Sequence, residues 1–401
     1  MVNAVLALNA GSSSLKFALF RQEGGPGAAL LARGEIEGIG GAPHFLVHDA
    51  QGAVLEEQRW GEGGGQGFDG LLTLLLDWIE RHPGADRLIA VGHRVVHGGR
   101  DFLAPVRVTG DVLAALEVLT PLAPLHQPRS LAPVRAIATL RPDLPQIACF
   151  DTAFHHTMPA AATRLALPRE YEDEGVRRYG FHGLSYEYIA RRLCLTAPHL
   201  AAGRVIVAHL GSGASLCAMR DGRSIDTTMS FTALDGLVMG TRCGAIDPGV
   251  LLWLLQQKGL SPGALEDLLY RRSGLLGVSG LSGDMRTLLA SGEPRAREAV
   301  ELFVHHVARE TGALAASLGG LDGFVFTAGI GEHAPEIRAA VSERLRWLGV
   351  EPAAAGACSD EGLLSAPGSR VEVRVIPTDE EAMIGQHTLD MLAESESTPG
   401  R

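Results

Sequence analysis

The chain has 401 residues, of which 46% are hydrophobic and 20% are charged, and its formal net charge is −11. This length and apolar content are enough for two well-buried domains of ordinary size. The acidic balance argues against a surface for nucleic acid or an anionic membrane, so local cations must neutralise any anionic substrate.

The N-terminal segment predicts a strand, a glycine-serine hairpin and a second strand. Two apolar runs, 5–8 and 15–20, flank the small residues Gly11, Ser12 and Ser14. Phosphate can approach such a turn, because glycine has no Cβ, the hydroxyls donate hydrogen bonds and Lys16 adds positive charge. An ordinary hairpin without a ligand is the alternative interpretation.

Two further apolar runs lead into glycine-rich segments. Residues 209–213 follow the run 205–208, and residues 329–333 follow the run 324–326. The P-loop sequence is absent, so any nucleotide binding is expected to use these glycine turns. Neither segment completes the GxGxxG pattern of a dinucleotide fold, which argues against a nicotinamide oxidoreductase.

Helical periodicity alternates with short apolar runs along the chain. This alternation predicts an α/β fold with largely parallel central strands. Helices are expected at 68–79 and 300–318, and strands at 88–96, 146–150, 205–210, 323–326 and 371–376.

A weak internal repeat predicts two related domains. Four residues of the first hairpin recur 200 positions later, as Val205, Gly211, Ser212 and Ala218. We expect one domain at 1–150 completed by a last helix at 387–401, a second at 151–386, and a central ligand cleft between them.

Charged residues stand at the ends of two predicted strands. Arg94 lies near the end of the run 89–96, and Asp151 follows the run 147–150. Open α/β sheets place their sites at such ends. Arg94 needs an anionic partner, which is either a substrate or a structural carboxylate, and Asp151 either orients an arginine or takes part in chemistry.

Further polar residues suit phosphoryl transfer. His182 lies between glycines, Arg242 lies in a glycine-punctuated loop, and acidic groups occur at 284–286 and 378–381. Phosphoryl transfer depends on alignment and charge neutralisation by arginines, a histidine donor, a carboxylate-held Mg²⁺ and glycine backbone. Neither hydride transfer nor Ser-His-Asp hydrolysis explains the same residues.

The five cysteines form no CxxC pair and leave an odd one over, as expected in a reducing compartment. We find no basic signal segment at the start and no apolar run long enough for a membrane span. The sequence therefore predicts a cytoplasmic protein.

Eight motifs in order resemble the acetokinase (acetate kinase) family, whose fold is shared with sugar kinases, heat-shock ATPases and actin (ribonuclease H-like domains). Together they span nearly the whole chain. They are the segments 9–16, 92–99, 150–155, 179–183, 239–242, 273–277, 326–332 and 377–381. The resemblance implies reversible, direct in-line transfer from ATP to acetate, giving acetyl phosphate and ADP, with Mg²⁺ (or Mn²⁺) and a homodimer.

The resemblance also implies roles for single residues. Arg94 would hold the acyl carboxylate, His182 and Arg242 would stabilise the phosphoryl group, and Asp151 would be the catalytic acid. Asn9 and Glu380 would position the metal. The acetate methyl would contact Val96, Leu125, Phe181 and Ala233, the last replacing a proline of the family. The nucleotide would be lined by Lys16, Ser12, Ser14, His209, Leu210, Gly211, Ser212, Gly213, Asp284, Met285, Arg286, Gly329, Ile330, Gly331, Glu332 and His333.

The sequence departs from the family pattern at several positions, including Ser212 and His333, where asparagine is usual. Hydroxyl and imidazole groups still donate hydrogen bonds, so we expect the chain to bind ATP. The sequence does not determine the affinity or the preferred base. Two alternatives remain: a propionate or butyrate kinase on the same scaffold, and a non-catalytic actin-like ATP-binding protein. The trio Arg94, His182 and Arg242 favours catalysis, since an ATP clamp alone has no need of them.

Overall fold

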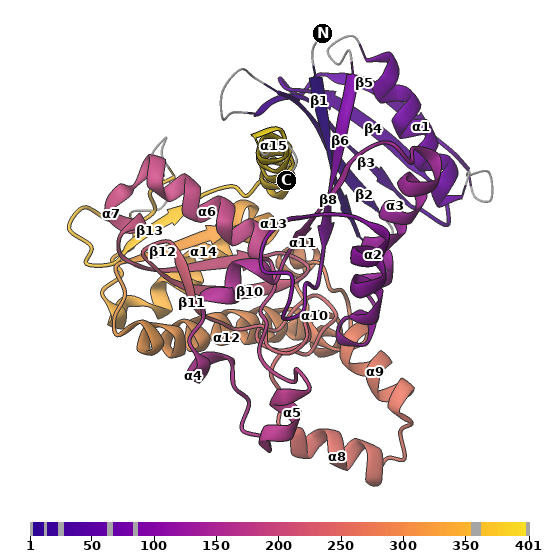
Figure 1. Ribbon diagram of the computed structural model, residues 1–401. Coiled ribbons are helices and arrows are strands. Elements are labelled where there is room, and N and C mark those ends of the chain that lie inside the picture. Colours follow the sequence, from indigo (N-terminus) through magenta and orange to yellow (C-terminus); the bar gives the residue numbers. More distant parts are fainter. Residues whose placement is uncertain are drawn as a thin grey trace. The chain divides into compact units, whose positions relative to one another are not determined.

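The computed structural model describes residues 3–11, 14–22, 28–61, 67–82, 87–353 and 362–397 (Figure 1). The chain divides into two compact units. Unit 1 consists of Met1–Ala153 and Asp379–Arg401, and unit 2 of Phe154–Thr378. None of the helices in the described ranges combines the length and apolarity needed to cross a bilayer.

Unit 1 contains a sheet with strand order β5-β4-β3-β2-β1-β6-β8-β7. The neighbours β1, β6 and β8 are parallel and the other pairs are antiparallel, which confirms the predicted parallel centre. The strands are β1 (Asn3–Ala10), β2 (Leu15–Gln22), β3 (Ala28–Glu37), β4 (His44–Asp49), β5 (Val54–Arg59), β6 (Arg87–Val95), β7 (Val106–Arg107) and β8 (Gln146–Phe150).

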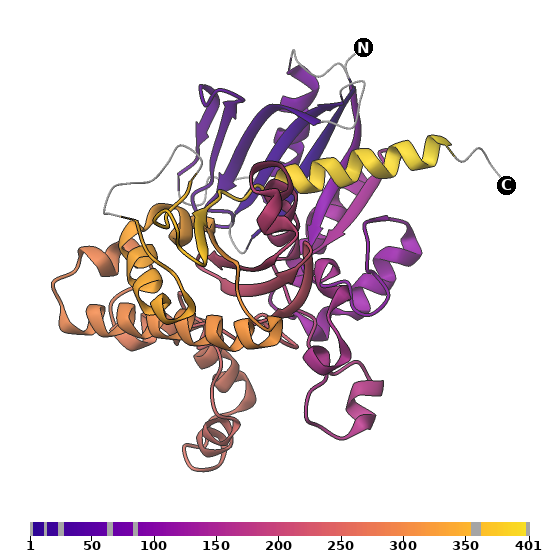
Figure 2. The same ribbon diagram turned by 90° about the vertical axis from the view of Figure 1, so that its left-hand side faces the viewer.

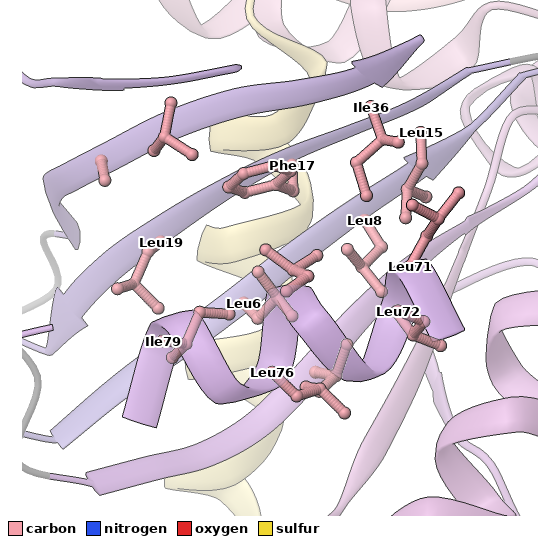
Figure 3. Close-up of a cluster of buried hydrophobic side chains, with 14 of the residues drawn as sticks. Leu6, Leu8, Leu15, Phe17, Leu19, Ile36, Leu71, Leu72, Leu76 and Ile79 are labelled. Carbon is pink, nitrogen blue, oxygen red and sulfur yellow. The ribbon is translucent and has the colours of Figure 1, made fainter. Parts of the chain in front are cut away.

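The main core of unit 1 lies between this sheet and α1. Alternate residues of β1 and β2 pack against one apolar side of α1, because successive side chains of a strand point to opposite faces of the sheet. Figure 3 shows these side chains, among them Leu6, Leu8 and Phe17 from the sheet and Leu72 and Leu76 from the helix. The helices of unit 1 are α1 (Phe68–Arg81), α2 (Gly110–Val118), η1 (Thr120–Leu122), α3 (Gln127–Leu140) and α15 (Glu380–Ser397).

Helix α15 covers the opposite face of the sheet and contacts β1, β2, β6 and β8 (yellow in Figure 2). The helix lies close to β6 because Gly92 has no side chain: a Cβ there would lie 2.2 Å from Thr388 Oγ1. It begins at Glu380, not near 387 as expected. Acidic residues stand at this start: Glu380 and Glu381 lie in the first turn, and Asp379 Oδ1 accepts from Ala382 N at 2.8 Å.

Unit 2 contains a sheet with order β11-β10-β9-β12-β13, in which β9, β12 and β13 are parallel. The series β3-β2-β1-β6-β8 in unit 1 has the same order and the same alternation of directions, which confirms the duplication predicted from the repeat. The strands are β9 (Arg204–Leu210), β10 (Ala214–Arg220), β11 (Arg223–Thr227), β12 (Gly323–Thr327) and β13 (Glu372–Val375).

Two long helices lie on opposite faces of the unit 2 sheet (Figure 1). Helix α6 packs Tyr186, Ile189 and Leu193 against β9 and β10, and α12 contacts β9, β10 and β11. The remaining elements are η2 (Ala153–Thr157), α4 (Ala160–Thr163), α5 (Arg169–Asp173), α6 (Gly183–Thr196), α7 (Pro198–Ala201), α8 (Pro248–Gln256), α9 (Pro262–Arg271), α10 (Gly274–Ser279), α11 (Met285–Ala290), α12 (Pro294–Leu318), α13 (Ala328–His333), α14 (Pro335–Arg344) and η3 (Arg346–Leu348).

The segment 329–333 is helix α13, not the glycine turn expected from sequence. Its first turn is closed by Glu332, whose Oε1 accepts from Ala328 N at 2.8 Å. Ala328 itself has φ +64°, a conformation that side chains rarely adopt. The reversal of the chain after β12 therefore takes place at Ala328, and the glycines continue the helix.

Candidate active site

In unit 1, three predicted site residues meet at the carboxyl ends of the parallel strands. Asn9 lies near the end of β1, Arg94 lies near the end of β6 and Asp151 directly follows β8. Arg94 Nε and Nη2 donate to the two oxygens of Asp151 at 2.9 and 2.5 Å, and Nη1 donates to Asn9 Oδ1 at 3.1 Å. Within the described residues, two of the five N–H groups of Arg94 have no protein acceptor and can bind an anion.

The electrostatics keep Arg94 charged. Its side chain is 20% exposed, whereas that of Asp151 is 1% exposed. Burial alone lowers the pKa of Arg94, but the charges of Asp151 and Glu380 more than reverse this, so the pKa of Arg94 is raised. The Arg94 guanidinium is therefore a permanent cation surrounded by the carboxylates of Asp151, Glu380 and Glu381.

The first turn of α15 brings two carboxylates to Asn9. Its Nδ2 donates to Glu380 Oε2 at 3.0 Å and to Glu381 Oε1 at 3.1 Å. Burial, followed by repulsion from Glu380, raises the pKa of Glu381. In the described part of the chain, no three His, Cys, Asp or Glu side chains are grouped to hold a metal.

This oxygen-donor set fits Mg²⁺, which needs only one or two protein carboxylates when water and substrate phosphates complete its shell. Of the two residues predicted to position the metal, Glu380 is the candidate ligand. Asn9 holds Glu380 through its amide N–H, while its own oxygen accepts from Arg94.

The first hairpin places Lys16 opposite Asn9 in the β1–β2 register. Lys16 is exposed, between the buried Leu15 and Phe17. Gly11 N donates to Ser14 O at 2.8 Å and closes the turn. Ser12 lies outside the described residues.

The four residues expected around an acyl methyl belong half to each unit. In unit 1, Val96 is buried after β6 and Leu125 is half-buried ahead of α3. In unit 2, Phe181 is 1% exposed and precedes His182, and Ala233 is half-buried in a loop.

His182 occupies the N-cap position of α6 with φ +59°, in the left-handed region. Its ring stacks on that of His209, with centroids 4.1 Å apart and an interplanar angle of 18°. Each Nδ1 is within hydrogen-bond distance of a serine: Ser215 Oγ for His182 and Ser185 Oγ for His209, both at 2.8 Å. Strained conformations of this kind persist where the surroundings fix them.

Arg242 lies in a loop that the start of α10 fixes through its backbone. Leu275 N donates to Met239 O at 2.8 Å, and Met239 N donates to Arg242 O at 3.2 Å. Gly274 has φ +61°, and a Cβ there would lie 2.2 Å from Met239 O. The side chain is directed by Ala233, whose carbonyl oxygen accepts from Arg242 Nη1 at 2.6 Å.

His182 and Arg242 converge at the second hairpin. A Cβ built on Gly213 would lie 2.8 Å from Arg242 Nη2 and 3.4 Å from His182 Nε2. Two side-chain nitrogens therefore face one position beside a glycine backbone, an arrangement suited to surrounding an anionic group.

One of the other predicted nucleotide segments, 284–286, lies close to this hairpin through the loop that contains Gly240. Gly240 N donates to Ser212 O at 3.1 Å, and a Cβ on Gly283 would lie 2.8 Å from Gly240 O. Asp284 is the N-cap of α11 and binds Arg286 N at 2.9 Å. Residues 211–213, 239–242 and 283–284 thus form one continuous surface of backbone.

Side chains in the nucleotide set fall into two groups. Met285 and Leu210 are buried in the core, and Glu332 serves the backbone, accepting from Ala328 N and from Thr378 N at 3.1 Å. Arg286 and His333 are exposed, at 87% and 76% of their side chains. A ligand can therefore meet Met285 and Leu210 only through backbone atoms.

Sequence reasoning missed the residues that hold the site residues in place. Ser215 is a lone hydroxyl in the apolar run 214–219, and this is a usable signal. Tyr186 stands four positions after His182 in α6, on the same side of the helix. The clamp made by Gly274 depends on backbone conformation, which the motif at 273–277 does not reveal.

A model of the acetokinase family matches residues 4–386. The sequence is 56% identical over 391 residues to an acetate kinase of Rhodopseudomonas palustris, covering 96% of this chain and 98% of that protein. A propionate kinase structure from Francisella tularensis has a TM-score of 0.87 at 36% identity, covering 96% of this chain and 98% of that one. The acetate kinase structure from Porphyromonas gingivalis has a TM-score of 0.83 at 36% identity, covering 97% and 100%.

Proposed function

This chain belongs to the acetokinase family, and we propose that it transfers the γ-phosphoryl group of ATP reversibly to acetate, giving acetyl phosphate and ADP. It is a phosphotransferase with a carboxyl group as acceptor. The observation that carries the proposal is the convergence of His182 Nε2 and Arg242 Nη2 beside Gly213.

In this reaction an acetate oxygen attacks the γ-phosphorus in line. The new O–P bond forms as the bond to the β,γ-bridging oxygen breaks, and ADP leaves with that electron pair. Negative charge on the transferring group is then neutralised by Arg242 and by the N–H of His182. The amide groups of Ser212 and Gly213 are assigned to the phosphates, because Gly211 N already donates to Gly213 O at 3.0 Å.

Arg94 is assigned to the acetate carboxylate through its two N–H groups without protein acceptors. A guanidinium is suited to this task because it binds carboxylate with two parallel hydrogen bonds. Asp151 is assigned as the group that orients Arg94, since both of its oxygens bind that arginine.

Glu380 is assigned as the protein ligand of Mg²⁺, with Mn²⁺ as an alternative ion, and Asn9 as the group that holds Glu380. When bound, the ion supplies charge neutralisation at the β- and γ-phosphates. Ser12, Ser14, Lys16, the backbone of 284–286 and that of 329–333 are assigned to the nucleotide.

Val96, Leu125, Phe181 and Ala233 are each assigned to contact with the acyl methyl group. A propionate kinase is the second candidate, because alanine at 233 gives less bulk than the proline expected there, and one methylene changes pocket affinity by only about 1 to 3 kcal/mol.

The test is formation of acyl phosphate from ATP and Mg²⁺, trapped with hydroxylamine, with acetate, propionate and butyrate compared side by side. We expect acetate hydroxamate, and none when Mg²⁺ or ATP is omitted. Binding of ATP without formation of hydroxamate from any of the acids would support the ATP-binding alternative and overturn the proposal.

We also propose a cytoplasmic homodimer. Helix α8 has no buried residue, and its Leu252 and Trp253 are 55% and 49% exposed, which supports an apolar contact between two copies. The four described cysteines are free thiols, in keeping with a reducing compartment. Light scattering should give twice the chain mass, and Leu252→Lys should lower it; a monomeric wild type would overturn the dimer.

A further inference from the structure

The histidine assigned to the phosphoryl group begins a buried chain of hydrogen bonds that continues through two hydroxyl groups. His182 Nδ1 lies 2.8 Å from Ser215 Oγ, and Ser215 Oγ lies 2.5 Å from the hydroxyl of Tyr186. Ser215 and Tyr186 are both 0% exposed. The three groups come from the N-cap of α6, from β10 and from the second turn of α6.

The direction of this chain follows from its last member. Within the described part of the chain, Ser215 Oγ is the hydrogen-bond partner of the Tyr186 hydroxyl. If Ser215 donated to Tyr186, the phenolic O–H would be buried without an acceptor, at a cost of about 1 to 3 kcal/mol. Burial raises the pKa of Tyr186 well above its ordinary value, so its proton is retained. Tyr186 therefore donates to Ser215.

The position of the imidazole proton follows in turn. With its oxygen accepting from Tyr186, Ser215 directs its own hydrogen at His182 Nδ1. A neutral imidazole has one donor and one acceptor nitrogen. Nδ1 is then the acceptor, and the ring proton lies on Nε2, the nitrogen that shares the space beside Gly213 with Arg242.

We propose that Tyr186 and Ser215 are positioning residues that fix His182 as the Nε2–H tautomer and so present a donor to the phosphoryl group. The catalytic meaning of this statement rests on the proposed function; the tautomer itself does not. The neighbouring histidine provides a contrast, because Ser185 binds His209 Nδ1 and also Thr378 Oγ1 at 2.9 Å, where either hydroxyl can donate.

The direct test is ¹⁵N NMR of the protein labelled in its histidine rings, with the His182 signals assigned by their loss in His182→Gln. We expect the protonated nitrogen in wild type to be Nε2. Tyr186→Phe, which removes one oxygen atom, frees Ser215 to accept from Nδ1 and should produce a mixture of tautomers. Ser185→Ala should change the His209 signals and leave those of His182 in place.

A dominant Nδ1–H tautomer in wild type, or a tautomer ratio unchanged in Tyr186→Phe, would overturn the proposal. Both outcomes are read without any activity measurement. Absence of acyl phosphate formation in wild type would instead overturn the proposed function alone.

Kinetics supply the second test. Tyr186→Phe and Ser215→Ala should each lower kcat by roughly fivefold to thirtyfold, less than the loss of a whole donor, with KM for ATP and for acetate within about twofold. Because Tyr186 acts through Ser215, the double variant should be no slower than Ser215→Ala. Multiplicative losses in the double variant would show two separate roles and contradict the chain of hydrogen bonds.

Discussion

Asp151 binds the guanidinium of Arg94 through both carboxylate oxygens, 2.9 Å from Nε and 2.5 Å from Nη2. An ionised carboxylate in such a pair has no proton to donate. Charge-assisted bidentate pairs also fix the plane of the guanidinium. The pair therefore favours an orienting role for Asp151 over the role of catalytic acid that family resemblance implies.

Asp151→Asn should raise the KM for acetate by roughly tenfold or more, because one amide oxygen cannot replace two carboxylate acceptors on Arg94. The KM for ATP should change little. Steady-state kinetics with each substrate varied would measure both, with thermal melting as the control for folding. A loss of kcat near a hundredfold at unchanged acetate KM would instead place Asp151 in the chemical step.

Much of the fold was predictable because its signals are local. The apolar period of α1 and the hairpin pattern at 5–20 each determine one element, and both were predicted correctly. The start of α15 and the helical form of 329–333 were not, since each involves a carboxylate that accepts from a backbone N–H in the first helical turn: Asp379 and Glu332.

The candidate site was predictable only as a set of residue types at strand ends. Sequence placed Arg94 and Asp151 there but left open whether they pair, because that depends on the register of β6 and β8. The hydrogen bond from Arg242 to the Ala233 carbonyl is equally invisible, since it depends on a loop conformation rather than on the identity of residue 233.

The backbone contact between Gly274 and the Arg242 loop can be tested with two glycines at the ends of α10, Gly274 at its start and Gly280 just after it. Gly274→Ala would place a Cβ 2.2 Å from Met239 O and 2.6 Å from Arg242 O, whereas Gly280 has open space around it. Both have positive φ, of +61° and +65°, so backbone strain is matched. We expect Gly274→Ala to lower kcat by about tenfold or more and Gly280→Ala to have little effect. Equal kinetics for the two variants would exclude the clamp.

Buried histidines predict a loss of stability in mild acid. Burial lowers the pKa of His93, His97 and His155 to about 4. Between pH 6.5 and 4 the unfolded chain binds protons that the folded chain does not, so stability is full above this range and falls as pH decreases.

The free energy of unfolding should fall by at most about 1.4 kcal/mol per pH unit for each histidine, measured by urea unfolding between pH 7 and 5. His155→Gln should reduce this fall per pH unit, and His333→Gln, which changes an exposed side chain, should not. A free energy of unfolding that stays constant over this range would contradict neutral buried histidines.

Acyl specificity should depend on residue 233. We expect propionate within about tenfold of acetate in kcat/KM and butyrate well behind, because alanine is smaller than the proline expected at position 233. Ala233→Pro should widen the preference for acetate. Since the Ala233 carbonyl also holds Arg242, the ratio between acids is the quantity to compare, not the absolute rate. A wild type that rejects propionate by a hundredfold would disprove the larger pocket.

The central claim is that the two arginines act at different stages, Arg94 on the acceptor acid and Arg242 on the charge that develops during transfer. The most direct measurement compares Arg94→Ala and Arg242→Ala with each substrate varied, using the half-exposed Arg309 as a matched Arg→Ala control. Arg94→Ala should chiefly raise the KM for acetate, and Arg242→Ala should lower kcat on the order of 10³-fold at similar KM. Near wild-type kinetics in both variants, or the same kinetic change in each, would contradict the account.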